Sequence, residues 1–416
     1  MKKELRLPIS NCSDLTTPRQ QWRCPMKTRI LFLMALLCAV VAGVHSTHAN
    51  TIRVTNTNDS GPGSLRQALA VAINGDTIDA TGVSGTIVLT SGALQITQNV
   101  RITGPGAGNL AVNGNATSDV FENFASDVTI SGFTITNGVG GGGIFNRGGL
   151  ALSKSSVISN AGGGIFTGSL GGPARLVTLT ITNCTVSGNS GGGISNNGSA
   201  FGTGGGGAEL TVSNCTISGN SGNGISSSAS GLEARAGSTV AISNSTLSGN
   251  SGNAIYNNAG RFAGASVSVK SCTISGNSGG GIYNNVSQGF PGAAKVKLDS
   301  TILKAGSSGQ NIFNHGGTVT SLGYNLATDH GGGFLTGPGD QINTLPRLGP
   351  LQDNGGPTFT HALLPGSPAI NAGNPHFTPP PFFEQRGPGY HRVVNGRIDI
   401  GSFEVQVTPT PTPTPP

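Results

Sequence analysis

The chain contains 416 residues, 69 of them glycine, and carries 23 Lys and Arg residues against 17 Asp and Glu residues, a formal net charge of +6. Seven of the basic and two of the acidic residues precede residue 50, so the rest of the chain carries 16 basic against 15 acidic residues. This near balance excludes a broad basic surface for nucleic acid.

Residues 1–49 are predicted to be a presequence and not part of the fold. The apolar run from Ile30 to Gly43 is too short to span a bilayer comfortably and has the length of a signal-peptide core. The basic segment that normally precedes such a core is found at Met26-Lys-Thr-Arg29. We therefore expect translation to start at Met26, cleavage near Ala49–Asn50 or Thr47, and an exported mature chain without a transmembrane span.

Residues 50–125 are predicted to form an N-terminal cap and the first coils of the fold. Ser64-Leu-Arg-Gln67 has the form of a helix capping box, and the apolar residues of 65–72 lie on one helical stripe. A short amphipathic helix here would cover strand edges that otherwise invite association. A partner-binding helix is the alternative. Strands of early coils are expected at 86–90 and 100–103.

A twelve-residue segment is repeated along residues 126–325. The segment is Asn183-Cys-Thr-Val-Ser-Gly-Asn-Ser-Gly-Gly-Gly-Ile194, with close copies that end at Ile225, Ile255 and Ile282 and looser copies that end at Ile165 and Ile312. Self-similarity at a nearly fixed period indicates a repeat architecture with one structural turn per copy.

Within one repeat the apolar residues alternate as they do in strands. Leu210 and Val212 share one face, and Cys215 and Ile217 take over after a bend near Ser213–Asn214. The Ser-Gly-Asn-Ser-Gly that follows is typical of a turn, and no helical pattern separates the strands. Each coil should lie on the previous one, with every strand paired in parallel with its copy. The predicted fold is therefore an all-β parallel β-helix, a solenoid without a single globular core.

Equivalent side chains of successive coils should form ladders about 4.8 Å apart. We expect an interior aliphatic ladder at Val186, Ile217, Leu247 and Ile274, and a ladder of bonded turn amides at Asn189, Asn220, Asn250 and Asn277. Cysteine occupies one further column at Cys184, Cys215 and Cys272, with Ser155, Ser245 and Ser300 placed in the same column. Ladder side chains point in parallel at a separation beyond the ~3.8 Å that disulfide Cβ atoms prefer, so small buried thiols are expected. A disulfide is the alternative, because export permits one.

The residue after the repeat isoleucine should point outward, since the isoleucine faces inward. This outward column runs through Phe145, Phe166, Ser195, Ser226, Tyr256, Tyr283 and Phe313. One interpretation is that stacked rings stabilise neighbouring coils. The other is that Tyr256, Tyr283 and Phe313, on three consecutive coils, form a strip that binds sugar rings or a partner.

Residues 326–406 are predicted to form an irregular C-terminal cap, and residues 407–416 a Thr-Pro linker. The densest polar chemistry of the chain lies in this region, at Asp353, His361, Glu384, Arg386, Arg397, Asp399 and Glu404. These side chains are either an acid/base cluster or ion pairs that hold an irregular backbone, and we favour the structural interpretation.

The coils themselves are poor in catalytic side chains. From Val128 to Leu298 the acidic residues are Glu209 and Glu233, at different places in their repeats, and residues 51–314 contain no histidine. Polysaccharide lyases and hydrolases need clustered carboxylates with a base or acid, and often Ca²⁺. We therefore assign no catalytic residue, no metal ligand and no cofactor.

The repeats resemble the right-handed parallel β-helix proteins of the pectate-lyase-like superfamily. The segment from Val54 to Leu69, followed by Asn74-Gly-Asp-Thr-Ile78, also resembles the CSLREA-type N-terminal motif of bacterial surface proteins, with Gly63 where that motif has cysteine. The first resemblance implies the fold, and the second implies a surface or secreted location.

The C-terminal part is similar to the choice-of-anchor β-helix proteins. The similar segments are Gly355–Gly373, Gln385-Arg-Gly387 and Asp399–Glu404. Where those proteins read DAG, DQRG and DIGAFE, this chain has Asn371, Glu384 and Ser402. The resemblance covers roughly residues 51–405 together with the N-terminal motif, and it carries no catalytic residue that could be transferred.

These observations predict an exported, monomeric and non-catalytic bacterial protein that acts as a surface adhesin or structural stalk. Its expected partner is a polysaccharide or a cell surface, with Tyr256, Tyr283 and Phe313 as the binding strip. The alternative is a polysaccharide lyase or glycoside hydrolase of the pectate-lyase-like superfamily.

Overall fold

The computed structural model describes residues 49–168, 175–200, 205–231, 236–287 and 293–406. Most of the predicted presequence, the Thr-Pro linker and Glu233 lie outside the described residues.

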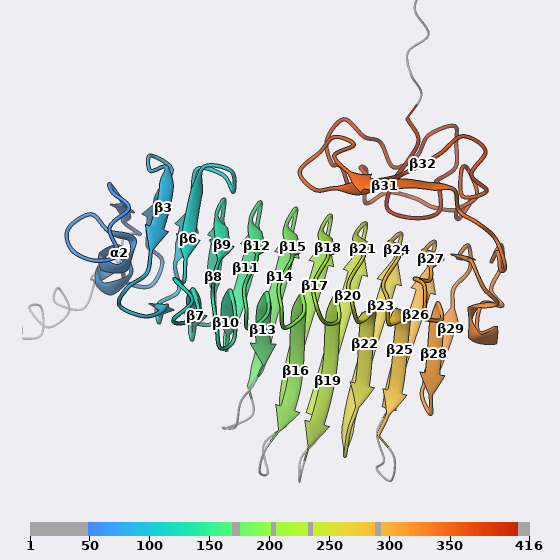
Figure 1. Cartoon of the computed structure of the whole chain (residues 1–416), viewed down its shortest axis with the longest axis horizontal. Helices are drawn as coiled ribbons and strands as arrows, with labels where there is room; N and C mark the ends of the chain where they lie inside the picture. The colour runs from blue at the N-terminus through green and yellow to red at the C-terminus, as the bar shows by residue number, and fades with distance from the viewer. Residues whose placement is uncertain (1–48, 169–174, 201–204, 232–235, 288–292, 407–416) are drawn as a thin grey trace, which may run out of the picture. The chain divides into compact units, whose positions relative to one another are not determined.

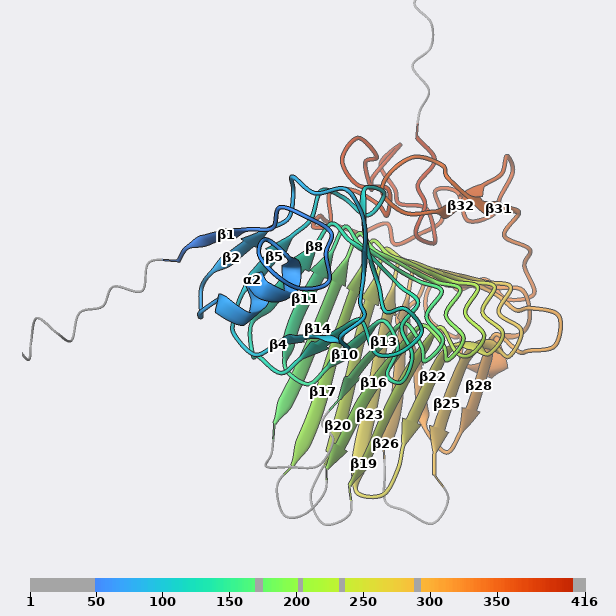
Figure 2. The same ribbon diagram turned by 60° about the vertical axis from the view of Figure 1, so that its left-hand side comes forward.

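Three parallel sheets, A, B and C, build the fold, and the chain visits them in the order A, B, C in each coil (Figures 1 and 2). Every strand of these sheets pairs in parallel with the equivalent strand of the neighbouring coil. The prediction of an all-β parallel β-helix is confirmed.

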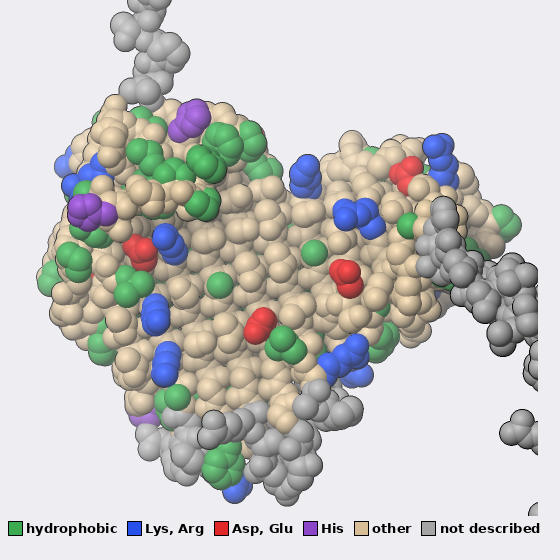
Figure 3. Space-filling view, turned by 180° about the vertical axis from the view of Figure 1, so that it is seen from behind, with side chains coloured by type: hydrophobic (Ala, Val, Ile, Leu, Met, Phe, Trp, Pro, Cys, Tyr) green, Lys and Arg blue, Asp and Glu red, His purple; other side chains and the backbone are tan. Residues whose placement is uncertain are grey.

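Sheet A has eleven strands in the described residues, and the strands lengthen from three to eight residues toward the middle of the solenoid. The face opposite to that of Figure 1 carries isolated charged side chains on a surface made mostly of other side chains and backbone (Figure 3). The strands are β1 Thr51–Arg53, β2 Thr77–Asp79, β5 Arg101–Thr103, β8 Val128–Ser131, β11 Gly149–Ser153, β14 Leu176–Thr182, β17 Gly206–Ser213, β20 Ala236–Ser243, β23 Ala263–Lys270, β26 Ala293–Asp299 and β29 Thr318–Ser321.

Sheet B has ten described strands, most of them three residues long, and in the close copies of the motif they hold Thr-Val-Ser, Thr-Ile-Ser or Thr-Leu-Ser. They are β3 Gly85–Val88, β6 Leu110–Asn113, β9 Thr134–Thr136, β12 Ser156–Ile158, β15 Thr185–Ser187, β18 Thr216–Ser218, β21 Thr246–Ser248, β24 Thr273–Ser275, β27 Ile302–Lys304 and β30 Leu326–Ala327.

Sheet C has nine described strands, most of which begin at or just before the isoleucine that closes the repeat motif. They are β4 Leu94–Ile96, β7 Phe121–Asn123, β10 Ile144–Asn146, β13 Ile165–Gly168, β16 Ile194–Ala200, β19 Ile225–Gly231, β22 Asn253–Ala259, β25 Gly280–Val286 and β28 Ile312–His315.

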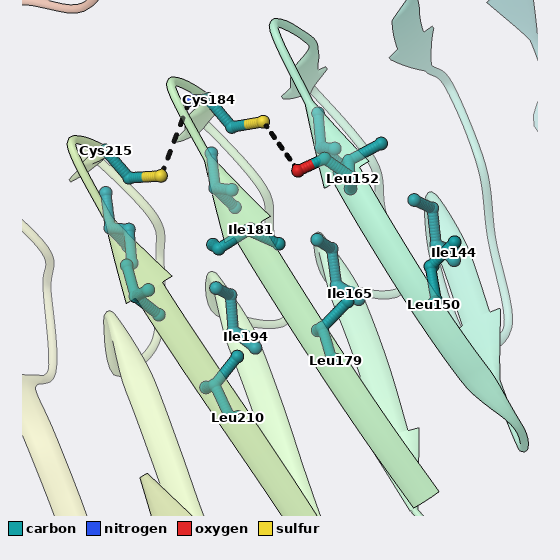
Figure 4. Close-up of a cluster of buried hydrophobic side chains, with 14 of the residues drawn as sticks. Ile144, Leu150, Leu152, Ile165, Leu179, Ile181, Cys184, Ile194, Leu210 and Cys215 are labelled. Atoms are coloured by element: carbon teal, nitrogen blue, oxygen red, sulfur yellow. Dashed lines mark hydrogen bonds between the residues drawn. The ribbon is translucent and has the colours of Figure 1, made fainter. Parts of the chain in front are cut away.

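The interior of the solenoid is a continuous stack of aliphatic side chains (Figure 4). Val186, Ile217, Leu247 and Ile274 occupy one register column of sheet B and are completely buried. Because parallel sheets are buried on their inner faces, this column stabilises adjacent coils by removing apolar surface from water.

An asparagine ladder runs along the turn between sheets B and C. The Oδ1 of Asn220 accepts hydrogen bonds from the backbone N (3.0 Å) and the Nδ2 (2.9 Å) of Asn189. The same pair of bonds joins Asn220 to Asn250, and Asn250 to Asn277. Asn160 adds a further rung before Asn189. All of these side chains are buried, so the turn is held by amides that are each donor and acceptor.

The thiol column differs from the prediction at one position. Ser155, Cys184, Cys215 and Ser245 follow one another as predicted, and the backbone N of Cys184 lies 3.4 Å from the Sγ of Cys215. The backbone N of Cys272 donates to Thr301 Oγ1 at 3.3 Å, so Thr301 continues the column and the assignment of Ser300 was wrong.

Ser300 instead occupies the turn between sheets A and B. Its φ of 49° matches the φ of 53° at Asn214 and 52° at Ser271, which are the left-handed residues at the same turn of other coils. The shift arises because Ile302 and Leu303 are both apolar and both buried, Leu303 in the solenoid interior and Ile302 under the C-terminal residues. A one-residue slip exchanges the two faces of a strand, and here either residue can face inward.

The three cysteines of the described residues are buried and not joined in disulfides. Burial raises the pKa of Cys272 to about 12 and holds that of Cys215 well above its ordinary value. We predict that a bulky maleimide labels Cys184, Cys215 and Cys272 only after unfolding, because all three thiols are buried, and in Cys215 and Cys272 the raised pKa also suppresses the reactive thiolate. Rapid labelling of the native protein, or an intact mass two hydrogens short, would contradict this.

The N-terminal helix α2, Leu65–Val71, forms where the capping box predicts it. Ser64 Oγ accepts a hydrogen bond from the backbone N of Gln67 at 3.2 Å, and Leu65 and Ala68 are buried against the first coils. Arg66 holds the helix in place by an ion pair of 2.6 Å with Asp59 and by bonds to two carbonyl groups. The helix therefore covers the open end of the solenoid interior.

The region predicted as a single C-terminal cap divides into two parts. At the last coil, Phe334 and Leu335 pack against the interior beside the short 3₁₀ helix Gly331–Gly333. Residues 345–406, with the antiparallel strands β31 Leu348–Gln352 and β32 Thr360–Leu363, fold back over the outer face of sheet B (Figure 1). We call residues 345–406 the C-terminal lobe.

The C-terminal lobe docks on the outward threonines of the repeats. Thr216 Oγ1 donates to the carbonyl of Phe359 at 2.5 Å, Thr246 Oγ1 donates to Gln385 Oε1 at 2.6 Å, and Thr273 Oγ1 accepts from the backbone N of Ser402 at 3.1 Å. These hydroxyl groups are buried.

Within the described ranges, no helix has the length and apolar character that crossing a membrane requires.

Candidate functional site

The outward aromatic column lies on sheet C in the predicted register. Phe145, Phe166, Ser195, Ser226, Tyr256, Tyr283 and Phe313 pair in that order on strands β10 to β28.

The rings of this column stack on each other. The ring centroids are 4.9 Å apart for Phe145 and Phe166, 5.4 Å for Tyr256 and Tyr283, and 4.8 Å for Tyr283 and Phe313. Tyr283 therefore has both of its faces covered by neighbouring rings. The stacking interpretation accounts for this geometry, and the strip offers a ligand mainly ring edges and the two phenol hydroxyl groups.

A polar row runs beside the rings, two residues further along each strand. Asn285 Nδ2 donates to Asn258 Oδ1 at 2.6 Å, and Asn285 Oδ1 lies 3.0 Å from His315 Nδ1. Burial raises the pKa of Tyr256 above its ordinary value of 10, so its hydroxyl keeps its proton well beyond neutral pH. Rings, hydroxyl groups and amides thus repeat together on the outer face of sheet C, in the manner of a surface that recognises hydroxyl-rich ligands.

The structure gathers part of the predicted C-terminal cluster into one buried ionic network. Arg386 Nε bonds Glu384 Oε1 at 2.5 Å, and the Arg386 guanidinium lies between the rings of Tyr390 and Phe403, 3.9 and 3.8 Å from their centroids. Glu404 Oε2 accepts from the backbone N of Asp399 at 2.9 Å. Arg386 also donates to the carbonyl of Glu404, so these groups tie the end of the C-terminal lobe together.

Arg392 completes this network and was missed by the sequence analysis. Its side chain is completely buried, its Nη1 lies 3.9 Å from Glu404 Oε2, and its Nη2 donates to the carbonyl of Asp399. No local pattern marks it, since His391-Arg392-Val393 lies in an irregular segment. The predicted cluster held more carboxyl groups than arginines, and this excess was the signal that could have indicated a further buried cation.

Three other predicted members of the cluster lie apart from the network. Asp353 is exposed and accepts from the backbone N of Gly355. His361 is buried between the carbonyl of Gly349 and Ser248 Oγ, and burial lowers its pKa. Arg397 donates to the carbonyls of Gly373 and Ala372. Each of these contacts holds backbone or docks the lobe.

The pKa values in the network follow from its burial. Burial raises the pKa of Glu384 to about 7, against the opposing charge of Arg386. Burial and the negative charge of Asp399 raise the pKa of Glu404 to about 8. Because Glu384 and Glu404 are completely buried, a polymeric substrate cannot reach them, which favours the structural interpretation.

Other carboxylates of the coils are accessible. Glu209 is exposed on the outer face of sheet A. Asp119 lies just before β7, and Glu122 lies within this strand. The Oδ1 of Asp119 accepts a hydrogen bond from the backbone N of Gly142 at 2.8 Å. Burial raises the pKa of Asp119, and the charge of Glu122 adds to the effect. Among the described side chains, no group of three or more His, Cys, Asp and Glu residues is arranged to hold a metal ion.

Comparisons with known proteins agree with this architecture. The family described as "Right handed beta helix region" matches residues 52–233. The fold is a right-handed parallel β-helix. The crystal structure of pectate lyase Pel9A is similar to this chain with a TM-score of 0.53 and 16% identity, covering 87% of this chain and 98% of that one. This likeness extends to the fold alone.

A second solved structure, Geobacillus virus E2 ORF18, has a TM-score of 0.42 and 11% identity, covering 73% of this chain and 65% of its own. No curated protein sequence matches this chain. The two flanking resemblances, CSLREA-type and choice-of-anchor-type, stay predictions.

Proposed function

We propose that this protein is a non-catalytic, exported β-helix protein that binds a glycan on the outer face of sheet C and acts as a surface adhesin or stalk. The observation that carries the proposal is the row of Tyr256, Tyr283 and Phe313 beside Asn258 and Asn285 on consecutive coils. Aromatic side chains next to amides present apolar and hydrogen-bonding surface together, which suits sugar rings.

Two further observations support a binding role. The parallel register repeats the same side chains at the coil spacing of about 4.8 Å, so the face presents a regular array to a polymer that is itself repetitive. The densest charged cluster is buried in the C-terminal lobe, where it ties the end of the lobe together. The surface location rests on the signal-peptide pattern of residues 26–49.

The test is glycan binding by Tyr256→Ser combined with Tyr283→Ser. We expect wild-type protein to bind one or more glycans of an immobilised panel, and the double variant to bind at least tenfold more weakly. The variant should also lose about 1–3 kcal/mol of stability, because two stacked pairs are removed. Binding by wild type that the double variant retains would contradict the role of this strip.

A matched control separates binding from stability. Ile217→Val removes one methylene from the interior of sheet B and is expected to cost about 0.5–1.5 kcal/mol without touching the outer face of sheet C. It should bind glycan as wild type does. Equal losses of binding and stability in both variants would leave the rings a stacking role alone.

A glycoside hydrolase is the second candidate, favoured by the neighbouring carboxyl groups of Asp119 and Glu122. Hydrolases use two carboxyl groups, one kept protonated by a raised pKa, and Asp119 has a raised pKa. Incubation with a polysaccharide panel, followed by assays for reducing ends and unsaturated products, tests this. Turnover that disappears in Asp119→Asn would replace the binding proposal with an enzymatic one.

A further inference from the structure

The aromatic stack on sheet C is interrupted at two neighbouring coils. Ser195 and Ser226 occupy the two register positions between Phe166 and Tyr256, which places these rings three coil spacings apart, about 14 Å. Phe145 covers one face of Phe166, and Tyr283 covers one face of Tyr256. The remaining face of each ring is directed toward a serine, so the interruption leaves ring faces uncovered.

A hollow of about 190 Å³ lies at this interruption. Phe166, Ser195, Ser226 and Asn223 line it, together with the glycine turns 162–164 and 191–193. Four of these glycines admit no larger residue, because a Cβ on Gly162, Gly164, Gly191 or Gly193 would lie 2.3–2.4 Å from a carbonyl oxygen of a neighbouring coil. The hollow is therefore a consequence of how closely the coils approach, and its depth comes from side chains that cannot be longer.

Asn223 bounds the hollow on the next coil. Asn223 is the equivalent of Gly192 one coil further along, because each of them lies two residues before the repeat isoleucine of its coil. Its Nδ2 donates to Ser226 Oγ at 3.2 Å, and its Oδ1 accepts from the backbone N of Asn253 at 2.8 Å. The amide and the serine hydroxyl are thus oriented before any ligand arrives, which lowers the entropic cost of binding.

The lining selects a class of ligand. It combines an uncovered ring face with two hydroxyl groups, an amide and glycine backbone, and no charged side chain is part of the lining. A pyranose ring matches this combination, because one of its faces carries C–H groups and its rim carries hydroxyl groups. A uronic acid would bring a carboxylate that no cation of the lining compensates, and a charge left unpaired on binding costs affinity.

We infer that this hollow is a subsite beside the proposed binding strip, and that it takes one pyranose ring of a neutral glycan, stacked on the free face of Phe166. A pyranose ring that occupies the place of the missing ring beside Ser195 would lie about one coil spacing, 4.8 Å, from Phe166 and would present its C–H face to it. The inference rests on the proposed function, since it names a subsite and the ligand class on the same face of sheet C.

The test is to complete the aromatic stack with Ser195→Phe and Ser226→Tyr. Wild-type protein is titrated by calorimetry with neutral oligosaccharides (cello-, xylo- and manno-hexaose) and with oligogalacturonate as the acidic probe. We expect binding of a neutral probe at least tenfold tighter than of oligogalacturonate, and its loss in the filled variant without a lower melting temperature. The matched control is Thr180→Phe with Thr211→Tyr, paired on adjacent coils of sheet A, which should bind as wild type.

The outcomes distinguish failure of the proposed function from failure of this inference alone. If wild type binds no probe and no glycan of the immobilised panel, the proposed function fails and this inference with it. If wild type binds but the filled variant binds equally well, the inference is overturned while the proposed function stands. Preference for oligogalacturonate would overturn the neutral ligand class.

A pair of fluorescence reporters keeps the inference testable if the filled variant does not fold. Phe166→Trp places an indole on the wall of the hollow, whereas Thr211→Trp places one on the outer face of sheet A, away from the proposed binding face. Addition of the bound neutral glycan should shift the indole emission of the Phe166→Trp variant and leave that of the Thr211→Trp variant unchanged. No shift in the Phe166→Trp variant, at a concentration that saturates binding, would overturn the inference.

Discussion

Replacement of Asn220 by alanine should lower the free energy of unfolding by about 2–5 kcal/mol. The substitution deprives the backbone N and the Nδ2 of Asn189 of their shared acceptor, and it removes the donor that reaches the carbonyl of Val186 at 3.1 Å. All of these groups are buried, so water does not replace the lost bonds. A buried donor left without a partner costs more than the average hydrogen bond contributes.

Denaturant unfolding followed by circular dichroism measures this loss. The matched control is Asn258→Ala, an asparagine of the outer face of sheet C that is half-buried and bonded to Asn285. We expect the control to cost less than about 1 kcal/mol, because water can solvate its partner. Equal losses in the two variants would mean that the turn ladder contributes no more than a surface amide pair.

The ladder positions could be predicted because two independent patterns agree in each repeat. Alternation of apolar residues places Ile217 on the inner face of a strand. Recurrence of the same residues in every repeat places Asn220 and its equivalents at the same point of each turn. A solenoid contacts only its neighbouring coils, so a local pattern is enough to specify the contact. The fold therefore followed from the sequence almost completely between residues 126 and 299.

The prediction became unreliable where the pattern offered two equivalent solutions. At β27 both Ile302 and Leu303 are apolar, so alternation alone cannot choose which one faces the interior. The choice is made by the C-terminal lobe, whose Ile400 and Phe403 pack against Ile302. That contact joins residues about a hundred positions apart, and no residue pattern in the repeat predicts it.

The docking of the C-terminal lobe could not be predicted for the same reason. The threonines Thr216, Thr246 and Thr273 alternate with inward residues and look like solvated outer side chains. Gln385 reaches them from more than a hundred residues away, donating to Thr216 Oγ1 at 3.0 Å. Turn-rich segments with glycine and proline carry no periodicity from which such a partner could be inferred.

The candidate site was predicted in part. The register of Tyr256, Tyr283 and Phe313 followed from the outward position after the repeat isoleucine. That their faces are covered by one another follows from the coil spacing, which is also the spacing of stacked rings. The hollow beside Phe166 could not be predicted, because its depth depends on how glycine turns of adjacent coils approach each other.

Loss of the buried charge in Arg392→Met should destabilise the C-terminal lobe by about 3–5 kcal/mol at pH 8. Two guanidinium groups, Arg386 and Arg392, face three carboxyl groups, Glu384, Asp399 and Glu404, in a region closed to water. Removal of one cation leaves a single guanidinium against three carboxyl groups. Burial lowers the pKa of Arg392, and the negative charges of Glu404, Glu384 and Asp399 oppose this shift, so the carboxyl groups favour the charged form of Arg392.

The pH dependence distinguishes this electrostatic role from a loss of packing. Burial raises the folded-state pKa of Glu384 to about 7 and of Glu404 to about 8, above the ordinary 4.5 of the unfolded chain. A carboxyl group of this kind contributes stability that is fully present below pH 4.5 and is lost as the pH rises through 7 to 8. At pH 5 both groups are protonated in the folded protein, so the cost of Arg392→Met should fall to less than half of its value at pH 8.

The measurement is denaturant unfolding at pH 5, 6.5 and 8 for wild type and Arg392→Met, with Arg397→Met as the matched control. Arg397 donates to the carbonyls of Gly373 and Ala372 and lies apart from the buried network, so its loss should cost the same at every pH. Adding Glu404→Gln, which mimics the protonated acid, should restore part of the stability of Arg392→Met at pH 8 and leave pH 5 unchanged. A cost of Arg392→Met that stays constant from pH 5 to pH 8 would show that Arg392 supports the C-terminal lobe by packing, and not by balancing the carboxyl groups around it.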